Sequence, residues 1–75
     1  MTLLNCDLDR KCCIILVNVE DEKLRVRLME IGFYLSGIVT VIKRSILKKT
    51  ILVEVLDSCF AIKSDMAKFI EVEYV

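Results

Sequence analysis

The apolar residues of this chain come in short runs separated by polar or charged residues. The longest run, Cys12–Val17, has six residues, whereas a helix that spans a bilayer needs about 18 or more. Since 56% of the 75 residues are apolar, such runs bury enough surface only by packing together in one dense core. The sequence therefore predicts a single folded domain over residues 1–75, with no direct insertion into a membrane.

Charge and composition argue against several classes of function. Eleven basic and eleven acidic residues cancel to a formal net charge of zero, whereas a nonspecific nucleic-acid binder usually carries a basic excess. The chain also has no histidine, which is the commonest general acid–base residue and a common metal ligand. We therefore expect a binding module that is not an enzyme, with no catalytic residue, no metal site and no cofactor.

Four cysteines stand at irregular spacing and form no CxxC pair. The first residues show no basic, apolar export signal, so the thiols are expected to stay reduced in the cytoplasm. Cysteine is often a small core hydrophobe, and we expect Cys6, Cys12, Cys13 and Cys59 to be free thiols in a cytoplasmic protein.

The best-marked element is a helix over residues 21–31. Leu24, Leu28 and Ile31 recur at i, i+4 and i+7, which places them in one stripe of the helix. Gly32 follows, where a helix commonly ends on a left-handed residue. A side chain at Gly32 is therefore expected to destabilise the domain more than one at Gly37, which stands in the following loop.

The other apolar runs are short, rich in β-branched residues and typical of strands. Five short strands in so small a chain favour a closed or nearly closed barrel, because closure removes exposed edges. The predicted fold is mainly β with one inserted helix (α+β), in the order β-α-β-β-β-turn-β. The strands are expected over Cys12–Val19, Ile38–Arg44, Thr50–Leu56, Cys59–Ile62 and Phe69–Tyr74, with one helical turn at 64–67.

The segment from Leu24 to Phe33 reads LRVRLMEIGF and resembles the LRxRLxELGF motif of the FeoA family. The likeness covers roughly Cys12–Glu73 without a gap. It continues through Val39-x-Val41-Ile42-Lys43-Arg44, Ile51-x-Val53-x-Val55, Phe60-Ala61-Ile62-Lys63 and Ile70-x-Val72-Glu73.

The resemblance implies an SH3-like β-barrel with an inserted helix. FeoA proteins are small cytosolic components of bacterial ferrous-iron uptake, and the family brings with it the expectation of transition metal ion binding. The implied partner is the membrane transporter FeoB, which carries a cytosolic GTP-binding domain. The implied function is an accessory protein, recruited to the inner face of the membrane, that binds a FeoB-like transporter and modulates its assembly or activity.

Three turns depart from the pattern of the family. Residues 46–50 replace a loop that is usually similar to Pro-Leu-Gly-Asp-Pro, and Ser36 and Asp57 stand where the family has glycine. All three departures lie in turns, so the predicted fold is unaffected.

The helix offers the first candidate contact residues. Arg25 and Arg27 match the family motif and are interpreted either as docking residues for an acidic partner surface or as ordinary members of surface ion pairs. Val26 and Met29 lie away from the apolar stripe. With Tyr34 and Leu35 they form either a contact patch or scattered exposed apolar residues, which are common.

A hairpin between the second and third strands offers the second candidate surface. If the hairpin is centred near Leu47, its outer face is largely apolar and is either covered by the helix or the N-terminal segment, or left as a contact surface. We predict that part of this face contacts the transporter or a second copy of the chain. The inner pairs are Val41–Val53 and Val39–Val55, and the outer pairs are Ile42–Leu52 and Ile38–Leu56. The candidate partner-binding residues are thus Arg25, Val26, Met29, Tyr34, Ile38, Ile42, Leu52 and Leu56.

A basic cluster surrounds the hairpin loop and consists of Lys43, Arg44, Lys48 and Lys49. It suits acidic lipid headgroups, an acidic protein face or nucleic acid, or it is simply a solvated loop. Nucleic acid is the weakest option, because the cluster lacks aromatic residues on which bases stack. The alternative functions are a nucleic-acid-binding barrel and a stand-alone regulatory barrel similar to the C-terminal domain of iron-dependent repressors.

Overall fold

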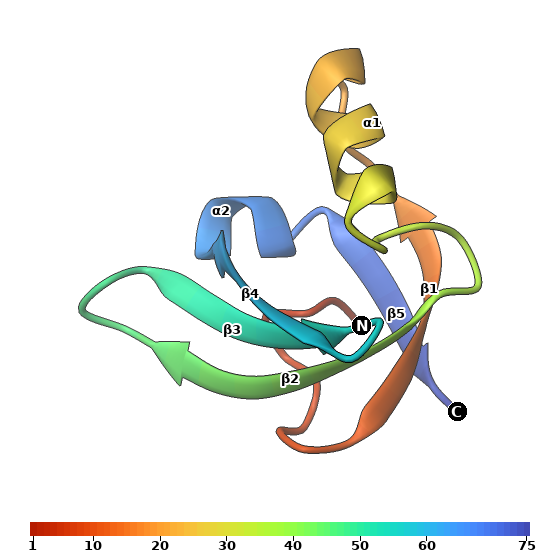
Figure 1. Ribbon diagram of the computed structural model, residues 1–75. Coiled ribbons are helices and arrows are strands. Elements are labelled where there is room, and N and C mark those ends of the chain that lie inside the picture. The colour runs from red at the N-terminus through yellow and green to blue at the C-terminus, as the bar shows by residue number, and fades with distance from the viewer.

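The computed structural model describes residues 1–75 and has five strands and two helices (Figure 1). The elements are β1 (Lys11–Val17), α1 (Glu22–Glu30), β2 (Ile38–Ser45), β3 (Thr50–Val55), β4 (Ser58–Lys63), α2 (Ser64–Ala67) and β5 (Ile70–Tyr74). The predicted mainly β fold with one inserted helix is confirmed. No helix of the structure is long and apolar enough to cross a membrane.

The five strands form one antiparallel sheet that curls on itself, in the order β4-β3-β2-β1-β5 (Figure 1). The two edge strands, β4 and β5, are joined by α2. Residues before β1 run along the free edge of β5, where Thr2 bridges Glu71 and the Leu3 N–H donates to the Ile70 carbonyl at 3.2 Å. This coverage protects an edge that would otherwise present unpaired backbone groups.

The core is aliphatic, with one large aromatic ring in it. Phe33, which follows α1, is the largest fully buried side chain, and Leu3 of the N-terminal segment is buried with it. The inner faces of the strands supply most of the remaining core, as the alternation of side chains along a strand requires. These residues are Cys12, Ile14, Val39, Val41, Ile51, Val53, Val55, Ile62, Ile70 and Val72.

Helix α1 is capped by hydrogen bonds at both ends. The Asp21 carboxylate accepts hydrogen bonds from the N–H groups of Lys23 at 3.0 Å and Leu24 at 3.2 Å, which caps the first turn. At the other end, the Gly32 N–H donates to Met29 O at 3.1 Å and the Phe33 N–H donates to Leu28 O at 2.8 Å. This pair of bonds is a Schellman motif. The φ of Gly32 is +116°, so the predicted left-handed glycine is confirmed.

The β2–β3 hairpin confirms one half of its predicted register and corrects the other. Val39 faces Val55 and Val41 faces Val53, as expected. A bulge at Ile42 then shifts the pairing by one residue, so that Lys43 faces Leu52. The predicted Ile42–Leu52 pair is therefore wrong, because one strand carries an extra residue there.

The predicted Ile38–Leu56 pair is also wrong, because Leu56 lies beyond the end of β3. Leu56 and Asp57 form the two-residue turn to β4, with φ values of 50° and 63°. A type I′ turn requires positive φ at both central residues. Leu56 thus leaves the sheet instead of facing Ile38 across it.

Two turns place non-glycine residues in the left-handed region where the FeoA pattern has glycine. The φ values are 68° for Ser36 and 63° for Asp57. Such a conformation disfavours a Cβ atom and suits glycine. The backbone at these two positions therefore favours glycine, although this chain has Ser36 and Asp57 there.

We expect Ser36→Gly and Asp57→Gly each to stabilise the domain by about 0.5–1 kcal/mol, because each removes a Cβ atom from a left-handed residue. The measurement is the midpoint of urea unfolding. Ser36→Ala and Asp57→Ala are the matched controls, since they keep the Cβ atom and should bring no gain. Glycine variants no more stable than the alanine controls would contradict the expectation.

Candidate functional site

An apolar groove lies between β1, α1 and the loop that follows α1. It encloses about 400 Å³ and is lined by Leu16, Val17, Arg25, Met29, Tyr34 and Leu35. Four of its apolar side chains remain substantially exposed, at 62% for Leu35, 49% for Met29, 45% for Leu16 and 38% for Tyr34. The groove is therefore an open apolar surface and not part of the core.

The groove results from two local features of the backbone. In β1, the pairing with β5 shifts between Ile14 and Leu16, and this bulge leaves Ile15 and Leu16 both exposed. After α1, the Schellman motif buries Phe33 and leads directly into a turn closed by the Gly37 N–H, which donates to Tyr34 O at 2.9 Å. The side chains of β1 and of this turn thus meet beside α1.

Arg25 is the one charged residue that lines the groove. Its Nη1 atom donates to the Val19 carbonyl at 3.3 Å, which holds the half-buried side chain in place. No carboxylate pairs with it, because the one ion pair of the structure joins Arg10 and Asp7 at 3.4 Å. The guanidinium therefore remains able to attract an acidic group of a partner.

A second depression adjoins the groove and shares Tyr34 with it. Ile38 and Leu56, which are 45% and 62% exposed, line it together with polar residues such as Glu54 and Lys11. Because Tyr34 belongs to both depressions, the apolar surface extends from α1 to the β3–β4 turn.

The structure brings five of the eight candidate residues together around Tyr34. Arg25 and Met29 line the groove, and Ile38 and Leu56 line the adjoining depression. The other three lie elsewhere: Val26 is exposed on α1 outside both depressions, and Ile42 and Leu52 are half-buried nearer the hairpin loop.

Sequence reasoning missed Leu16 and Val17, because the first apolar run was interpreted as a largely buried strand. Leu16 is exposed only because of the bulge in β1, and no sequence signal marks that bulge.

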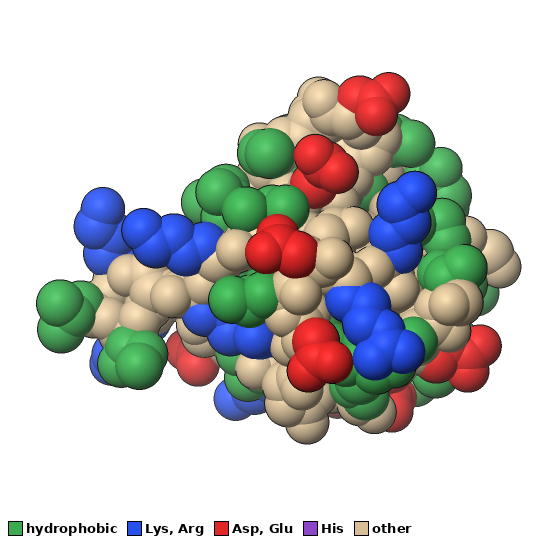
Figure 2. Space-filling view, turned by 90° about the horizontal axis from the view of Figure 1, so that it is seen from below, with side chains coloured by type: hydrophobic (Ala, Val, Ile, Leu, Met, Phe, Trp, Pro, Cys, Tyr) green, Lys and Arg blue, Asp and Glu red, His purple; other side chains and the backbone are tan.

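The β2–β3 hairpin carries the basic cluster at its projecting end, to the left in Figures 1 and 2. Figure 2 shows hydrophobic side chains at this end with Lys and Arg side chains beside them. Lys43, Lys48 and Lys49 are exposed, which fits the expected cluster.

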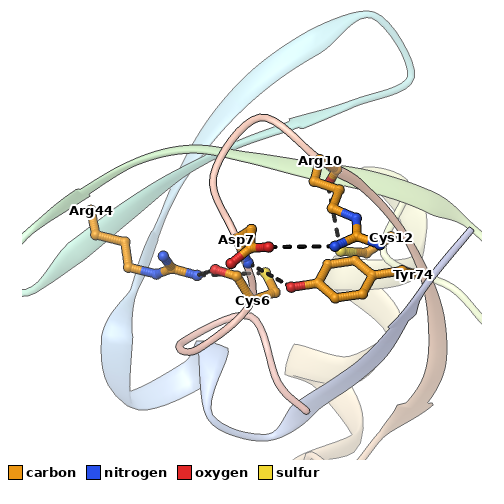
Figure 3. A network of polar contacts seen from close by, with 6 residues as sticks. All are labelled: Cys6, Asp7, Arg10, Cys12, Arg44 and Tyr74. Atoms are coloured by element: carbon orange, nitrogen blue, oxygen red, sulfur yellow. Dashed lines mark hydrogen bonds and ion pairs between the residues drawn. The ribbon is translucent and has the colours of Figure 1, made fainter.

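Arg44 does not belong to this surface. Its Nη2 atom donates to Leu3 O at 2.9 Å. The same atom donates to Cys6 O, as Figure 3 shows. The side chain is half-buried and joins β2 to the N-terminal segment. Arg44 is therefore a structural residue, and the predicted four-residue cluster is reduced to three lysines.

The N-terminal segment is also held by Tyr74 of β5 (Figure 3). The Asp7 N–H donates to Tyr74 Oη at 2.9 Å, and the guanidinium of Arg10 lies 3.5 Å from the centre of the Tyr74 ring. Stacking of a cation on an aromatic ring adds a modest stabilisation.

The cysteines lie apart from the groove. Cys6 and Cys12 are buried, Cys13 is half-buried and Cys59 is exposed. Burial, together with the neighbouring Cys6 thiol, raises the pKa of Cys12 to about 11. This thiol therefore stays protonated at neutral pH, which disfavours it as a nucleophile or metal ligand. The structure contains no cluster of three or more His, Cys, Asp or Glu side chains that could hold a metal ion.

Known proteins resemble the chain in sequence pattern and in fold. A sequence model of the FeoA domain matches residues 1–74, whereas no curated protein matches. The iron(II) transport protein A of Clostridium thermocellum is 23% identical, with a TM-score of 0.88 over all of this chain and 46% of that one. The chain thus spans less than half of that protein's length.

Two further solved structures are similar. FeoA of Chlorobium tepidum is 21% identical, with a TM-score of 0.89 over all of this chain and 70% of that one. FeoA of Stenotrophomonas maltophilia, solved with zinc, is 25% identical, with a TM-score of 0.80 over 97% of this chain and 89% of that one. It is described as a prokaryotic SH3 domain protein, which agrees with the SH3-like barrel expected from the sequence. The chain belongs to the FeoA domain family.

Proposed function

We propose that this chain is a cytoplasmic accessory protein of ferrous-iron uptake that binds the cytosolic part of a FeoB-like membrane transporter. The family supports this proposal, as does the description of the S. maltophilia relative as a candidate activating factor for ferrous iron transport. The contact modulates the assembly or activity of the transporter and brings the chain to the inner face of the membrane.

The apolar groove is the observation that carries the proposal. It combines a tyrosine, a methionine and an arginine with exposed aliphatic residues. Aromatic residues, Met and Arg are enriched in protein interfaces, whereas an open apolar surface is unfavourable in water unless a partner covers it. The unpaired guanidinium of Arg25 favours a partner with an acidic group near its apolar contact.

The proposed role is protein–protein contact, without catalysis and without a dedicated metal site. The chain has no histidine, and its thiols and carboxylates do not gather into a ligand set. The S. maltophilia protein was solved with zinc, whereas this chain has no cluster of three or more His, Cys, Asp or Glu side chains that could hold a metal ion. Iron enters the proposal as the cargo of the transporter.

Capture of the transporter from detergent-solubilised membranes tests the proposal. We expect the double variant Met29→Lys with Leu35→Lys to lower the affinity for the transporter by about 100-fold or more, because hot-spot truncations commonly cost about 2 kcal/mol or more. Both side chains are exposed in the free protein, so the variant should keep its unfolding midpoint.

The matched control is Leu4→Lys with Leu8→Lys, which adds the same charge at exposed apolar residues of the N-terminal segment. This control should capture the transporter as well as wild type does. A folded groove variant that captures the transporter like the control would refute the proposed binding surface. If the wild-type protein does not capture the transporter but binds RNA or DNA with an affinity that falls as salt is added, the nucleic-acid alternative is favoured.

A further inference from the structure

The end of the β2–β3 hairpin exposes two adjacent aliphatic side chains almost completely. We call residues Ser45–Lys49 the hairpin tip. Ile46 is 90% exposed and Leu47 is 96% exposed, more than any other large apolar residue of the chain. No neighbouring element covers them, because the tip projects from the barrel (Figures 1 and 2). Burial of such side chains against another apolar phase is strongly favourable.

Unpaired cations surround the two side chains. Lys43, Lys48 and Lys49 are exposed, and none forms an ion pair, since the one ion pair of the structure is Arg10–Asp7. Thr50 also pairs with Lys63 of β4, which places a fourth exposed lysine at the same end of the sheet.

Acidic residues are nearly absent from this end of the molecule. Residues 43–50 contain no Asp or Glu. The neighbouring carboxylates are Asp65, in the first turn of α2, and Asp9, whose N–H donates to Val41 O of β2 at 2.8 Å. Asp65 follows Ser64, whose N–H donates to Lys49 O at 2.9 Å. The local charge is therefore positive in a chain whose formal net charge is zero.

We propose that the hairpin tip binds the surface of an anionic lipid bilayer. Ile46 and Leu47 enter the boundary between headgroups and acyl chains, and the lysines contact the headgroup phosphates. A convex apolar tip with cations around it complements this surface. Both the burial of apolar side chains and the attraction of lysines to anionic lipids contribute to the free energy of interfacial binding. A depression of about 430 Å³ lies beside the tip and is lined by Lys43, Ser45, Lys48, Thr50, Ile51, Leu52 and Ala61. Ile46 and Leu47 do not line it, so these two side chains are left as a convex apolar surface and not as part of a pocket for a peptide.

This inference goes beyond the proposed function, because it requires no transporter. Shallow binding of a loop also differs from the membrane insertion that the short apolar runs argue against. In the cell it would orient the chain with its hairpin toward the lipid and leave the apolar groove free.

Co-sedimentation of the purified protein with lipid vesicles is the first test. We expect binding to vesicles of equal parts phosphatidylglycerol and phosphatidylcholine, weakened by salt, and little binding to phosphatidylcholine alone. Ile46→Ser with Leu47→Ser should weaken binding by about 30-fold or more. Lys48→Gln with Lys49→Gln should weaken it by roughly 25-fold, at about fivefold per lysine.

The matched control is Lys11→Gln with Lys23→Gln, which removes two exposed lysines elsewhere and should weaken binding far less. Equal binding to both kinds of vesicle, no binding at all, or tip variants that bind like wild type would each overturn the proposal.

Tryptophan fluorescence gives a second, position-specific test, because the chain has no tryptophan of its own. The Leu47→Trp variant should shift its emission to the blue with anionic vesicles and be quenched by brominated acyl chains. Leu56→Trp, at the opposite end of β3, should do neither. Shifts at both positions, or at Leu56→Trp alone, would contradict insertion of the tip.

The vesicle result and the transporter result are independent. Failure of transporter capture with intact vesicle binding would refute the proposed function alone. Loss of transporter capture by Ile46→Ser with Leu47→Ser, together with absent vesicle binding, would assign the tip to a protein contact and overturn the lipid proposal.

Discussion

Replacement of Gly32 by valine is expected to lower the free energy of unfolding by about 3 kcal/mol, which combines left-handed strain with overpacking. The φ of this residue is +116°, and a Cβ atom would lie 2.8 Å from Val55 Cγ2 and 3.0 Å from Leu56 Cδ1. The variant thus strains the Schellman motif and pushes α1 away from the sheet. The measurement is the midpoint of urea or thermal unfolding, with a fall in Tm of more than about 12 °C.

A suitable control is Glu30→Val, which places the same β-branched side chain at an exposed residue of the same helix. It should cost no more than about 0.7 kcal/mol, the range of ordinary helix propensities. Equal midpoints for Gly32→Val and Glu30→Val would show that the helix does not end at Gly32.

Gly37 is more constrained than its place in a loop suggests. A Cβ atom there would lie 2.9 Å from Tyr34 O and 3.1 Å from Gly32 O, and backbone atoms cannot move aside as a flexible side chain can. Gly37→Ala should therefore also destabilise the domain. The expected order, with Gly32→Val the more harmful, still follows from the left-handed φ of Gly32.

Replacement of Arg44 by methionine is expected to lower the free energy of unfolding by about 2 kcal/mol, because hydrogen bonds to charged groups contribute about 1.5–3 kcal/mol. Methionine keeps an apolar stem of similar length but leaves the carbonyls of Leu3 and Cys6 without their donor. Arg44 Nε is buried without an acceptor, which offsets part of the loss. The N-terminal segment should therefore loosen, with faster amide exchange at Leu3 and Asp9.

Lys43→Met is the control for this prediction, since Lys43 is the exposed neighbour of Arg44 in β2. It should change stability by less than about 0.5 kcal/mol, as surface substitutions usually do. If both variants unfold at the same urea concentration and show the same exchange at Leu3, Arg44 does not hold the N-terminal segment.

Much of the fold could be predicted because local signals in this sequence agree with one another. The helix stripe ends on a glycine that the backbone requires, and alternating valines put β2 and β3 in register as far as Val41. Beyond that point, the bulge at Ile42 changes the pairing. A bulge depends on the twist and closure of the whole sheet, so the hairpin residues alone do not reveal it.

Of the residues that line the groove, the sequence predicts the positions of those whose place on α1 follows from the helical period. Met29 was expected away from the apolar stripe of α1 and Arg25 to its side, and both line the groove together with Tyr34, which follows the end of that helix. Leu16 depends on a bulge in β1. Arg44 was interpreted as a surface charge, because the carbonyls that accept its hydrogen bonds belong to residues 41 and 38 positions away in the sequence. Long-range contacts of this kind leave no local pattern.

The most direct test of the proposed function is an NMR titration of the isotopically labelled chain with the purified cytosolic part of a FeoB-like transporter. The largest changes in amide chemical shift should fall on Leu16, Arg25, Met29, Tyr34 and Leu35, which line the apolar groove. The hairpin tip should change little, because no lipid is present. Absence of any shift at saturating transporter, or shifts confined to residues outside the groove, would contradict the proposed binding surface.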